Sequence, residues 1–191
     1  MIGIDIYHGD AEKKKTLDYA ELNKTLDFVI IKATDGQKTD PKLMLNYNST
    51  LTLKQGFYAY TYATNAIIAK AEAEAFCRAI KPLKCEMGCY IDVEDKRLKN
   101  LSKDALTVIL NTWFATAKKF GVQMGLYSNP DWLENRLEPE KLQTDKLWLA
   151  VWTNNVSTLV KYRQKYKPDI IQYTNAYKLA SGLTVDGDMV L

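Results

Sequence analysis

The chain has 191 residues, of which 47% are apolar and 26% are charged. This composition excludes a disordered chain and predicts one globular domain over residues 1–191. The formal charge of +3 is too small and scattered to indicate a nucleic-acid partner, and no apolar stretch reaches the roughly 18 residues of a membrane span, so neither nucleic-acid binding nor membrane insertion is expected.

Few side chains are available for nucleophilic or metal chemistry. Three cysteines, Cys77, Cys85 and Cys89, and the only histidine, His8, match no common zinc spacing, so no metal site is expected. The N-terminus shows no export signal, which predicts synthesis in the cytoplasm and reduced thiols. A nucleophilic centre built on His8 has no Gly-x-Ser-x-Gly motif to accompany it. Acid and base chemistry is therefore expected from carboxylates.

Strands and helices are predicted to alternate along the chain. Apolar runs rich in β-branched and aromatic residues predict strands, and helix formers that follow a capping residue predict helices. In the first half, strands are expected at 2–7, 28–34 and 57–62, an amphipathic stretch at 17–26, and helices at 41–54 and at 66–81 behind an Asn65 cap. In the second half, strands are expected at 89–95, 123–128, 147–152, 169–173 and around Val185 and Asp186, a long helix between Ser102 and Gly121, and a short helix opened by Asn129 and Pro130.

The strand predicted at 89–95 carries two acids, Asp92 and Glu94, and is the expected centre of a site. Residues two apart in a strand point to the same face, about 7 Å apart. Two like charges in that arrangement must pair, shift a pKa or face an open cleft. A surface strand end with two solvated acids is the alternative that this motif leaves open.

The alternation of buried strands with crossover connections predicts an α/β fold with a parallel sheet. Seven or eight strands favour a barrel, although such a barrel usually needs about 250 residues, so several helices would be short or missing. In an open or a closed sheet the functional face is the C-terminal edge of the strands. Acids and aromatic residues near such ends are Asp5, Asp35, Asp92, Glu94, Tyr127, Trp152 and Tyr173.

Eight short motifs also occur in a recognisable order. They are Gly3-Ile-Asp-Ile-Tyr, Phe28-Val-Ile-Ile-Lys-Ala-Thr-Asp-Gly, Gly56-Phe-Tyr, Ile91-Asp-Val-Glu, Gly125-Leu-Tyr-Ser-Asn-Pro, Leu147-Trp-Leu-Ala, Gln172-Tyr and Val185-Asp. In this order they resemble the glycoside hydrolase family 25 lysozymes, for which phage endolysins are a common setting. The resemblance implies a flattened, irregular TIM-like β/α barrel with some short or missing helices. It also implies an N-acetylmuramidase that hydrolyses the β-1,4 bond between N-acetylmuramic acid and N-acetylglucosamine in bacterial peptidoglycan, without a metal or organic cofactor.

The resemblance assigns four acids to the site. Asp5 matches the acid of the family's first strand, and Asp92 and Glu94 match its Asp-x-Glu pair, with Glu94 as the general acid/base. Asp186 matches the acid near the C-terminal end of the family. Asp188 follows two residues later, which leaves the choice between these last two aspartates open.

Substrate contacts are expected from aromatic and polar side chains at the same edge. Aromatic faces can stack on sugar rings, although each ring alone is more often a packing residue. The chain departs from the family at Ala59, where a histidine is common, and at Asp35, where glutamate is frequent. The residues assigned to substrate binding are Tyr58, Tyr60, Tyr62, Tyr127, Trp152, Gln172 and Lys32.

A mechanism follows from the carboxylates. Mutual repulsion spreads their pKa values, and we expect Glu94 to stay protonated beside an ionised Asp92. Because both acids are expected on one strand face, retention through the substrate's 2-acetamido group is predicted, with attack by Asp5 or Asp186 left open. The alternatives are another Asp-x-Glu glycosidase, such as a chitin-cleaving enzyme, and a wall-binding module without catalysis. A monomer is assumed, action on the wall after release is expected, and a C-terminal wall-binding domain outside residues 1–191 is left open.

Overall fold

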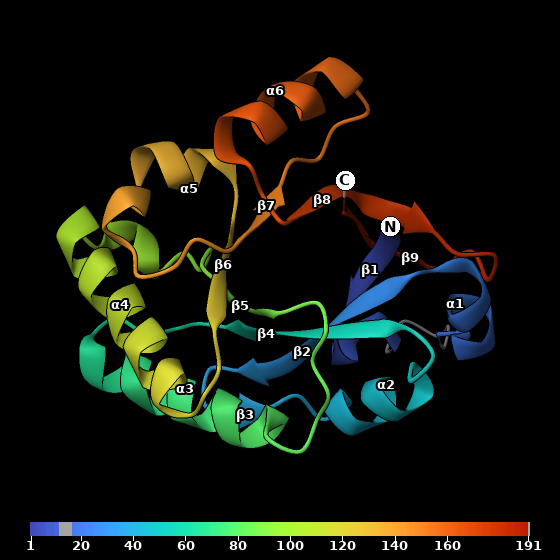
Figure 1. Ribbon diagram of the computed structural model, residues 1–191, viewed down its shortest axis with the longest axis horizontal. Helices are drawn as coiled ribbons and strands as arrows, with labels where there is room; N and C mark the ends of the chain where they lie inside the picture. Colours follow the sequence, from blue (N-terminus) through green and yellow to red (C-terminus); the bar gives the residue numbers. More distant parts are fainter. Residues whose placement is uncertain (12–16, 191) are drawn as a thin grey trace.

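A closed barrel forms the centre of the molecule (Figure 1). The computed structural model describes residues 1–11 and 17–190. The barrel strands are β1 (Ile2–Ile6), β2 (Phe28–Asp35), β4 (Lys54–Tyr60), β5 (Cys89–Asp92), β6 (Met124–Ser128), β7 (Leu147–Ala150), β8 (Ile170–Lys178) and β9 (Thr184–Met189). They form one continuous sheet, and parallel pairing of β1 with β2 closes it. The predicted α/β barrel is therefore confirmed.

One barrel strand runs against the others. β9 is antiparallel to both β1 and β8, so its first residues lie beside the C-terminal end of β1. At the opposite end of this pair the amino group of Met1 donates to the carbonyl of Val190 at 2.9 Å, and the two termini lie together in Figure 1. A short strand outside the barrel, β3 (Lys38–Thr39), pairs with the end of β2. Gly36 makes this tight turn with a φ of 59°, which glycine adopts without strain.

Helices of unequal length cover the barrel. The α-helices are α1 (Tyr19–Thr25), α2 (Leu43–Ser49), α3 (Ala66–Ile80), α4 (Lys103–Lys119), α5 (Pro130–Asn135) and α6 (Val156–Tyr166), with 3₁₀ turns η1 (His8–Ala11), η2 (Leu98–Asn100) and η3 (Pro139–Lys141). The two longest, α3 and α4, pack side by side on one flank (Figure 1). None of the described helices is long and apolar enough to span a membrane. Short helices explain how a barrel fits into this chain length.

The predicted helix starts are confirmed by their caps. The side chain of Asn65 accepts from the Ile68 backbone N–H, and that of Ser102 accepts from Ala105. Asn129 accepts from Trp132, with proline in the first turn of α5. Each side chain satisfies a backbone donor that the first helical turn leaves unpaired.

Apolar side chains form two layers separated by the barrel wall. Between wall and helices lie residues such as Phe76 of α3 and Trp113 of α4, both fully buried. Inside the barrel, Trp148 of β7 is surrounded by aromatic and aliphatic side chains from neighbouring strands: Phe28, Ile30, Tyr58, Tyr90, Tyr127, Ala150 and Ile170. The barrel interior is thus packed, and function is left to its rim.

Some predicted boundaries were wrong. The helix expected at 41–54 spans Leu43–Ser49, because β4 already begins at Lys54 and pairs with β2. The strand expected at 57–62 accordingly starts earlier and ends at Tyr60. Helix α6 was not predicted because it has no fully buried residue, so its apolar pattern is weak.

Candidate active site

Four carboxylates meet at the C-terminal edge of the barrel. Asp5 lies on β1 and is the direct partner of Asp186 across the β1–β9 pair. Asp92 ends β5, and Glu94 follows two residues later. The charge of Asp186 raises the pKa of each of the other three acids, after the larger effect of burial. The structure therefore brings the four predicted acids into one site.

The strand predicted at 89–95 stops at Asp92. Beyond it, Val93 donates a backbone hydrogen bond to the carbonyl of Tyr127, and the chain leaves the sheet. Asp92 and Glu94 are therefore not neighbours on one face of a regular strand, and that prediction was wrong. The physical reason is that β6, the partner strand, bends into the cap of α5 at this point and offers no further ladder.

Asp92 and Glu94 differ in exposure. Asp92 is 5% exposed, whereas Glu94 is open to solvent. Burial raises the pKa of Asp92 well above its usual range, the charge of Glu94 raises it further, and Lys32 opposes this rise. Partial loss of hydration also raises the pKa of Glu94, followed by the charge of Asp186. Burial raises the pKa of Asp92 more strongly than that of Glu94, because Asp92 is the more buried carboxyl, so burial alone does not account for the predicted order.

Gln172 of β8 ties Asp5 to two aromatic side chains. Its Nε2 donates to Oδ2 of Asp5 at 2.7 Å. Its Oε1 accepts from the Tyr127 hydroxyl at 2.9 Å and from the Trp152 indole N–H at 2.7 Å. Gln172 is 1% exposed, so its amide serves protein groups and orients Asp5, where a direct substrate contact was predicted.

The aromatic residues assigned to substrate binding fall into two groups. Tyr58 and Tyr127 are buried and pack on Trp148, with ring centroids 5.7 and 4.4 Å from it. These two rings belong to the barrel interior. The others present ring surface to solvent, and they are Tyr60, Tyr62 and Trp152, the last 56% exposed.

Lys32 of β2 brings a cation to this edge. Its Nζ lies 4.9, 5.5 and 5.1 Å from the ring centroids of Tyr7, Tyr58 and Tyr60. Its charge lowers the pKa values of Asp92 and Glu94, partly offsetting the effect of their burial. Lys32, assigned to substrate binding from the sequence, therefore also acts on the charge of the site acids.

Asp10 is a site acid that the sequence analysis did not single out. It lies in η1, half-buried, and accepts from the Tyr7 backbone N–H at 2.8 Å. Burial raises the pKa of Asp10 to about 6, the Tyr7 hydrogen bond opposes this rise, and the charge of Asp186 adds to it. The available signal was its position just after the first strand, at the functional edge.

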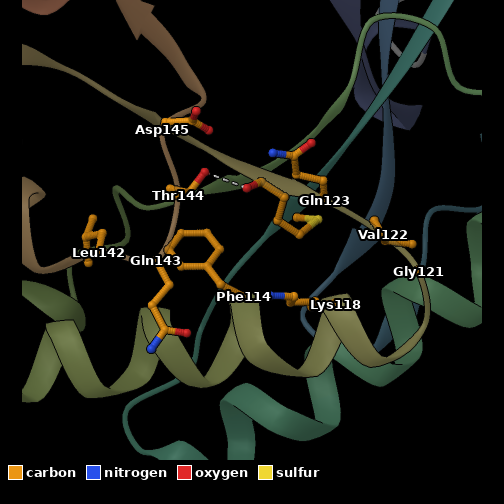
Figure 2. Close-up of a pocket in the computed structure, with 10 residues that line it drawn as sticks. Phe114, Lys118, Gly121, Val122, Gln123, Leu142, Gln143, Thr144 and Asp145 are labelled. Atoms are coloured by element: carbon orange, nitrogen blue, oxygen red, sulfur yellow. Dashed lines mark hydrogen bonds between the residues drawn. The ribbon is translucent and has the colours of Figure 1, made fainter.

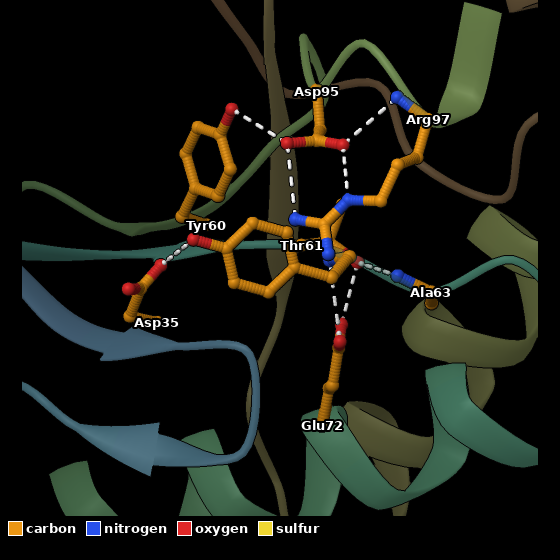
Figure 3. Close-up of polar contacts among 8 residues, drawn as sticks. Asp35, Tyr60, Thr61, Ala63, Glu72, Asp95 and Arg97 are labelled. Carbon is orange, nitrogen blue, oxygen red and sulfur yellow. Dashed lines mark hydrogen bonds and ion pairs between the residues drawn. The ribbon is translucent and has the colours of Figure 1, made fainter.

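A hydrogen-bond network holds the loop that carries Glu94 (Figure 3). Asp95 accepts from the Arg97 backbone N–H at 2.9 Å and from its Nε at 2.6 Å. The Tyr60 hydroxyl donates to the same carboxylate at 3.3 Å. The guanidinium of Arg97 stacks over the Tyr62 ring, 3.9 Å from its centroid. The part of the loop that follows Glu94 is thus tied to Tyr60 at the end of β4 and to Tyr62 just beyond it.

The same network extends to β2 and α3. The Tyr62 hydroxyl donates to Asp35 at 2.6 Å, and the Thr61 hydroxyl donates to Glu72 at 2.6 Å. Beside it lies a cavity of ≈ 730 Å³ that Tyr62 and Arg97 help to line. The rim around Glu94 is therefore built from side chains of β2, of the segment after β4 and of α3. All of these side chains lie outside the motif Ile91-Asp-Val-Glu.

A second cavity lies at the other end of the barrel. Its volume is ≈ 650 Å³, and it opens between α4 and the segments before β6 and β7 (Figure 2). There the Thr144 hydroxyl donates to the carbonyl of Met124 at 2.7 Å. Phe114 and Leu142 supply apolar walls, and the four site acids are not among its lining residues.

A closed β/α barrel with clustered carboxylates at the C-terminal edge of its strands is an arrangement typical of glycoside hydrolases. The family model "Glycosyl hydrolases family 25" matches residues 4–182. The chain belongs to this family, and it is a glycoside hydrolase. The family resemblance predicted from the motifs is confirmed.

Solved structures show the same fold. The catalytic domain of the endolysin ply40 from bacteriophage P40 of Listeria monocytogenes superposes with a TM-score of 0.81 at 20% identity, covering 100% of this chain and 93% of that one. A family 25 glycosyl hydrolase from Bacillus anthracis gives 0.76 at 22% identity, with 100% and 88% covered. The modular autolysin LytC from Streptococcus pneumoniae, solved with a synthetic peptidoglycan ligand, gives 0.77 at 23% identity. The match covers 98% of this chain but 46% of LytC, so this chain spans about half of that protein. No curated protein sequence matches this chain.

Proposed function

We propose that this chain is an N-acetylmuramidase that hydrolyses the β-1,4 bond from N-acetylmuramic acid to N-acetylglucosamine in bacterial peptidoglycan. The observation that carries the proposal is the exposed Glu94 beside buried Asp92, with Asp5 and Asp186 facing them from β1 and β9. Family membership and the likeness to a peptidoglycan-bound autolysin support the choice of substrate.

Glu94 is the general acid/base in this proposal. It is the most accessible carboxyl of the four, so it can reach a glycosidic oxygen above the rim. Partial burial and the charge of Asp186 raise the pKa of Glu94, which favours the protonated form that a general acid needs. After donating this proton to the leaving oxygen, the carboxylate can activate the incoming water.

Asp92 orients the substrate's 2-acetamido group, whose oxygen closes onto the anomeric carbon with retention of configuration. Its Oδ1 is buried and has no hydrogen-bond partner within residues 1–11 and 17–190, which leaves it able to accept a substrate N–H. Because Asp92 is recessed at 5% exposure, it is poorly placed for direct attack on a sugar ring. The burial of Asp92 therefore supports this role, in place of the shared strand face that the sequence suggested.

Product analysis tests the activity. Purified cell wall is digested and the released fragments are reduced with borohydride and examined by mass spectrometry. The proposal expects reduced muramic acid at the new ends. Reduced glucosamine at those ends, or faster cleavage of chitin oligomers than of wall glycan, would identify a different glycosidase. Wall binding without any new reducing end would identify a binding module.

The place where the protein acts is inferred from the same comparisons. Several structures with this fold are endolysins, among them the ply40 domain. We propose that this protein likewise acts on the bacterial cell wall. Loss of turbidity of wall suspensions after addition of the purified protein measures this action directly.

A further inference from the structure

A second carboxyl pair lies beneath the site. Asp188 of β9 is fully buried and Asp5 of β1 is 7% exposed. In the antiparallel β1–β9 pair, Asp188 lies opposite Gly3 and Asp186 lies opposite Asp5, so the two aspartates of β9 bracket Asp5. Burial raises the pKa values of Asp5 and Asp188 well above their usual range, and Asp188 is the largest charged influence on Asp5.

Hydrogen bonds from the barrel wall hold each carboxyl on one side. The Trp148 indole N–H donates to Oδ1 of Asp188 at 2.8 Å, and Gln172 Nε2 donates to Oδ2 of Asp5 at 2.7 Å. The other oxygen of Asp188, Oδ2, is buried and receives no hydrogen bond from an N–H or hydroxyl donor among the described residues, while the carboxyl of Asp5 lies within hydrogen-bonding reach of Asp188. A bare carboxylate oxygen in such a place is strongly unfavourable, so this atom needs a proton or a donor.

Among the residues that the structure describes, no cation pairs with either carboxyl of the pair. Asp186 and Asp10 face Asp5 with further negative charge, and the surrounding rings of β4, β5, β6 and β8 are neutral phenols: Tyr58, Tyr90, Tyr127 and Tyr173. Neither Asp5 nor Asp188 makes an ion pair with a lysine or arginine in the described ranges 1–11 and 17–190. Two adjacent buried anions repel strongly in this environment.

We propose that Asp188 is a positioning residue that shares one proton with Asp5, so that the pair carries a single negative charge beneath the site. Trp148 and Gln172 each fix one oxygen of the pair, and the shared proton lies between the remaining oxygens. Asp5 is thereby held in one orientation toward Asp186 and the rim. The catalytic consequence rests on the proposed muramidase function, whereas the shared proton does not.

A double-mutant cycle on stability tests the shared proton without any assay of activity. Asp5→Asn, Asp188→Asn and the double variant keep the shape of the side chains and remove one or both carboxyls. The free energy of unfolding is measured against pH by urea titration, and circular dichroism checks the fold. An aspartate in the unfolded chain has a pKa of about 3.9, so from about pH 4 upward unfolding of the wild type releases the retained proton.

The proposal predicts both the sign and the size of the pH dependence of stability. The one retained proton of the pair contributes a tenfold rise in the unfolding equilibrium constant per pH unit, so this contribution lowers stability as pH rises through the window; Asp10, Asp92 and Glu94 add slopes that every variant keeps. Either single variant should remove this tenfold slope, and the double variant should remove no more than either one. Parallel curves for wild type and Asp188→Asn would overturn the proposal, as would additive losses in the double variant, which indicate two independent protons.

A second readout concerns the active enzyme. Relief from the neighbouring carboxyl lowers the pKa of Asp5 in Asp188→Asn, so the acidic limb of the rate profile should move to lower pH. Asp188→Leu, which cannot donate to Asp5, should lower kcat more than Asp188→Asn does. If the double-mutant cycle gives the expected stabilities but the acidic limb does not move, the pair shares a proton that has no effect on catalysis. Absence of wall cleavage in the wild type would count against the proposed function and leave the stability test standing.

Discussion

Gln172 and Asp5 are 167 residues apart in the chain, and Gln172 Nε2 lies 2.7 Å from Asp5 Oδ2. This bond joins β1 to β8, across β9. The orientation of a site acid therefore depends on correct closure of the whole barrel. Substitutions that loosen closure should lower activity before they unfold the protein, since the site is assembled from both ends of the chain.

Glu94→Gln should abolish nearly all cleavage and leave the fold intact. The amide has almost the same shape but cannot donate a proton to the leaving oxygen, which corresponds to a loss of ~10²- to 10⁴-fold. Turbidity of a wall suspension gives the rate, and circular dichroism checks the fold. A variant that retains activity within a few-fold of wild type would place the general acid on another residue.

Asp186→Asn should lower the rate and shift its pH dependence. The charge of Asp186 raises the pKa of Glu94, so removing this charge lowers the pKa of Glu94. A general acid must be protonated, and its pKa sets the alkaline limb of kcat/KM. That limb should therefore move to lower pH. An alkaline limb that stays in place would mean that Asp186 does not act on Glu94.

Trp152 should affect substrate binding through its ring. Through its N–H, which contacts Gln172, it should also affect the orientation of Asp5. The ring is 56% exposed, and the indole N–H donates to Gln172 at 2.7 Å. Trp152→Phe keeps a ring and loses the donor, whereas Trp152→Ala loses both. With soluble glycan fragments, the alanine variant should raise KM more than the phenylalanine variant does. Equal KM values for the two would remove the ring from the substrate-binding surface.

Replacing all three cysteines should leave turnover unchanged. Cys85 and Cys89 lie with their Sγ atoms 3.5 Å apart at the start of β5, at the end of the barrel opposite the acids, and Cys77 lies on α3. Because Cys77 and Cys89 are buried, alanine at each of these positions should lower the free energy of unfolding by roughly 0.5–3 kcal/mol. Urea titration measures this loss. A folded triple variant without turnover would show that a thiol takes part in the reaction.

Wall glycan that lacks the N-acetyl group on muramic acid should bind and resist cleavage. Without the acetamido oxygen the substrate cannot close onto its own anomeric carbon, and Asp92 loses the acetamido group that it orients. Initial rates on normal and deacetylated wall are compared, with binding measured by sedimentation. Equal turnover would rule out participation of the acetamido group, and a glycosyl adduct trapped on Asp5 or Asp186 would establish a covalent enzyme intermediate.

Much of the fold could be predicted because its signals are local. Asn65 and Ser102 are capping residues directly before runs of helix formers, and the structure begins helices at both places. Continuous apolar runs identified the buried strands in the same way. Helix α6 gave no such signal, since none of its side chains is fully buried and its sequence resembles a polar loop.

The sequence could predict which acids lie together in the candidate site, but not their protonation or the role of Gln172. The motifs identified Asp5, Asp92, Glu94 and Asp186, because family position assigns acids one by one. The proton order of Asp92 and Glu94 depends on exposure, which arises where β5 ends, and strand ends depend on the neighbouring strand. The buried role of Gln172 depends on long-range register, which no local pattern contains.

The meeting of the two chain ends has a practical consequence. The Met1 amino group and the Val190 carbonyl are joined at 2.9 Å at the end of the barrel away from the carboxylates. A fluorescent label, affinity tag or fused targeting protein attached at either end would start from the same spot on the surface. Neither fusion order should obstruct glycan entry, so both orders can be compared at equal access to the active site.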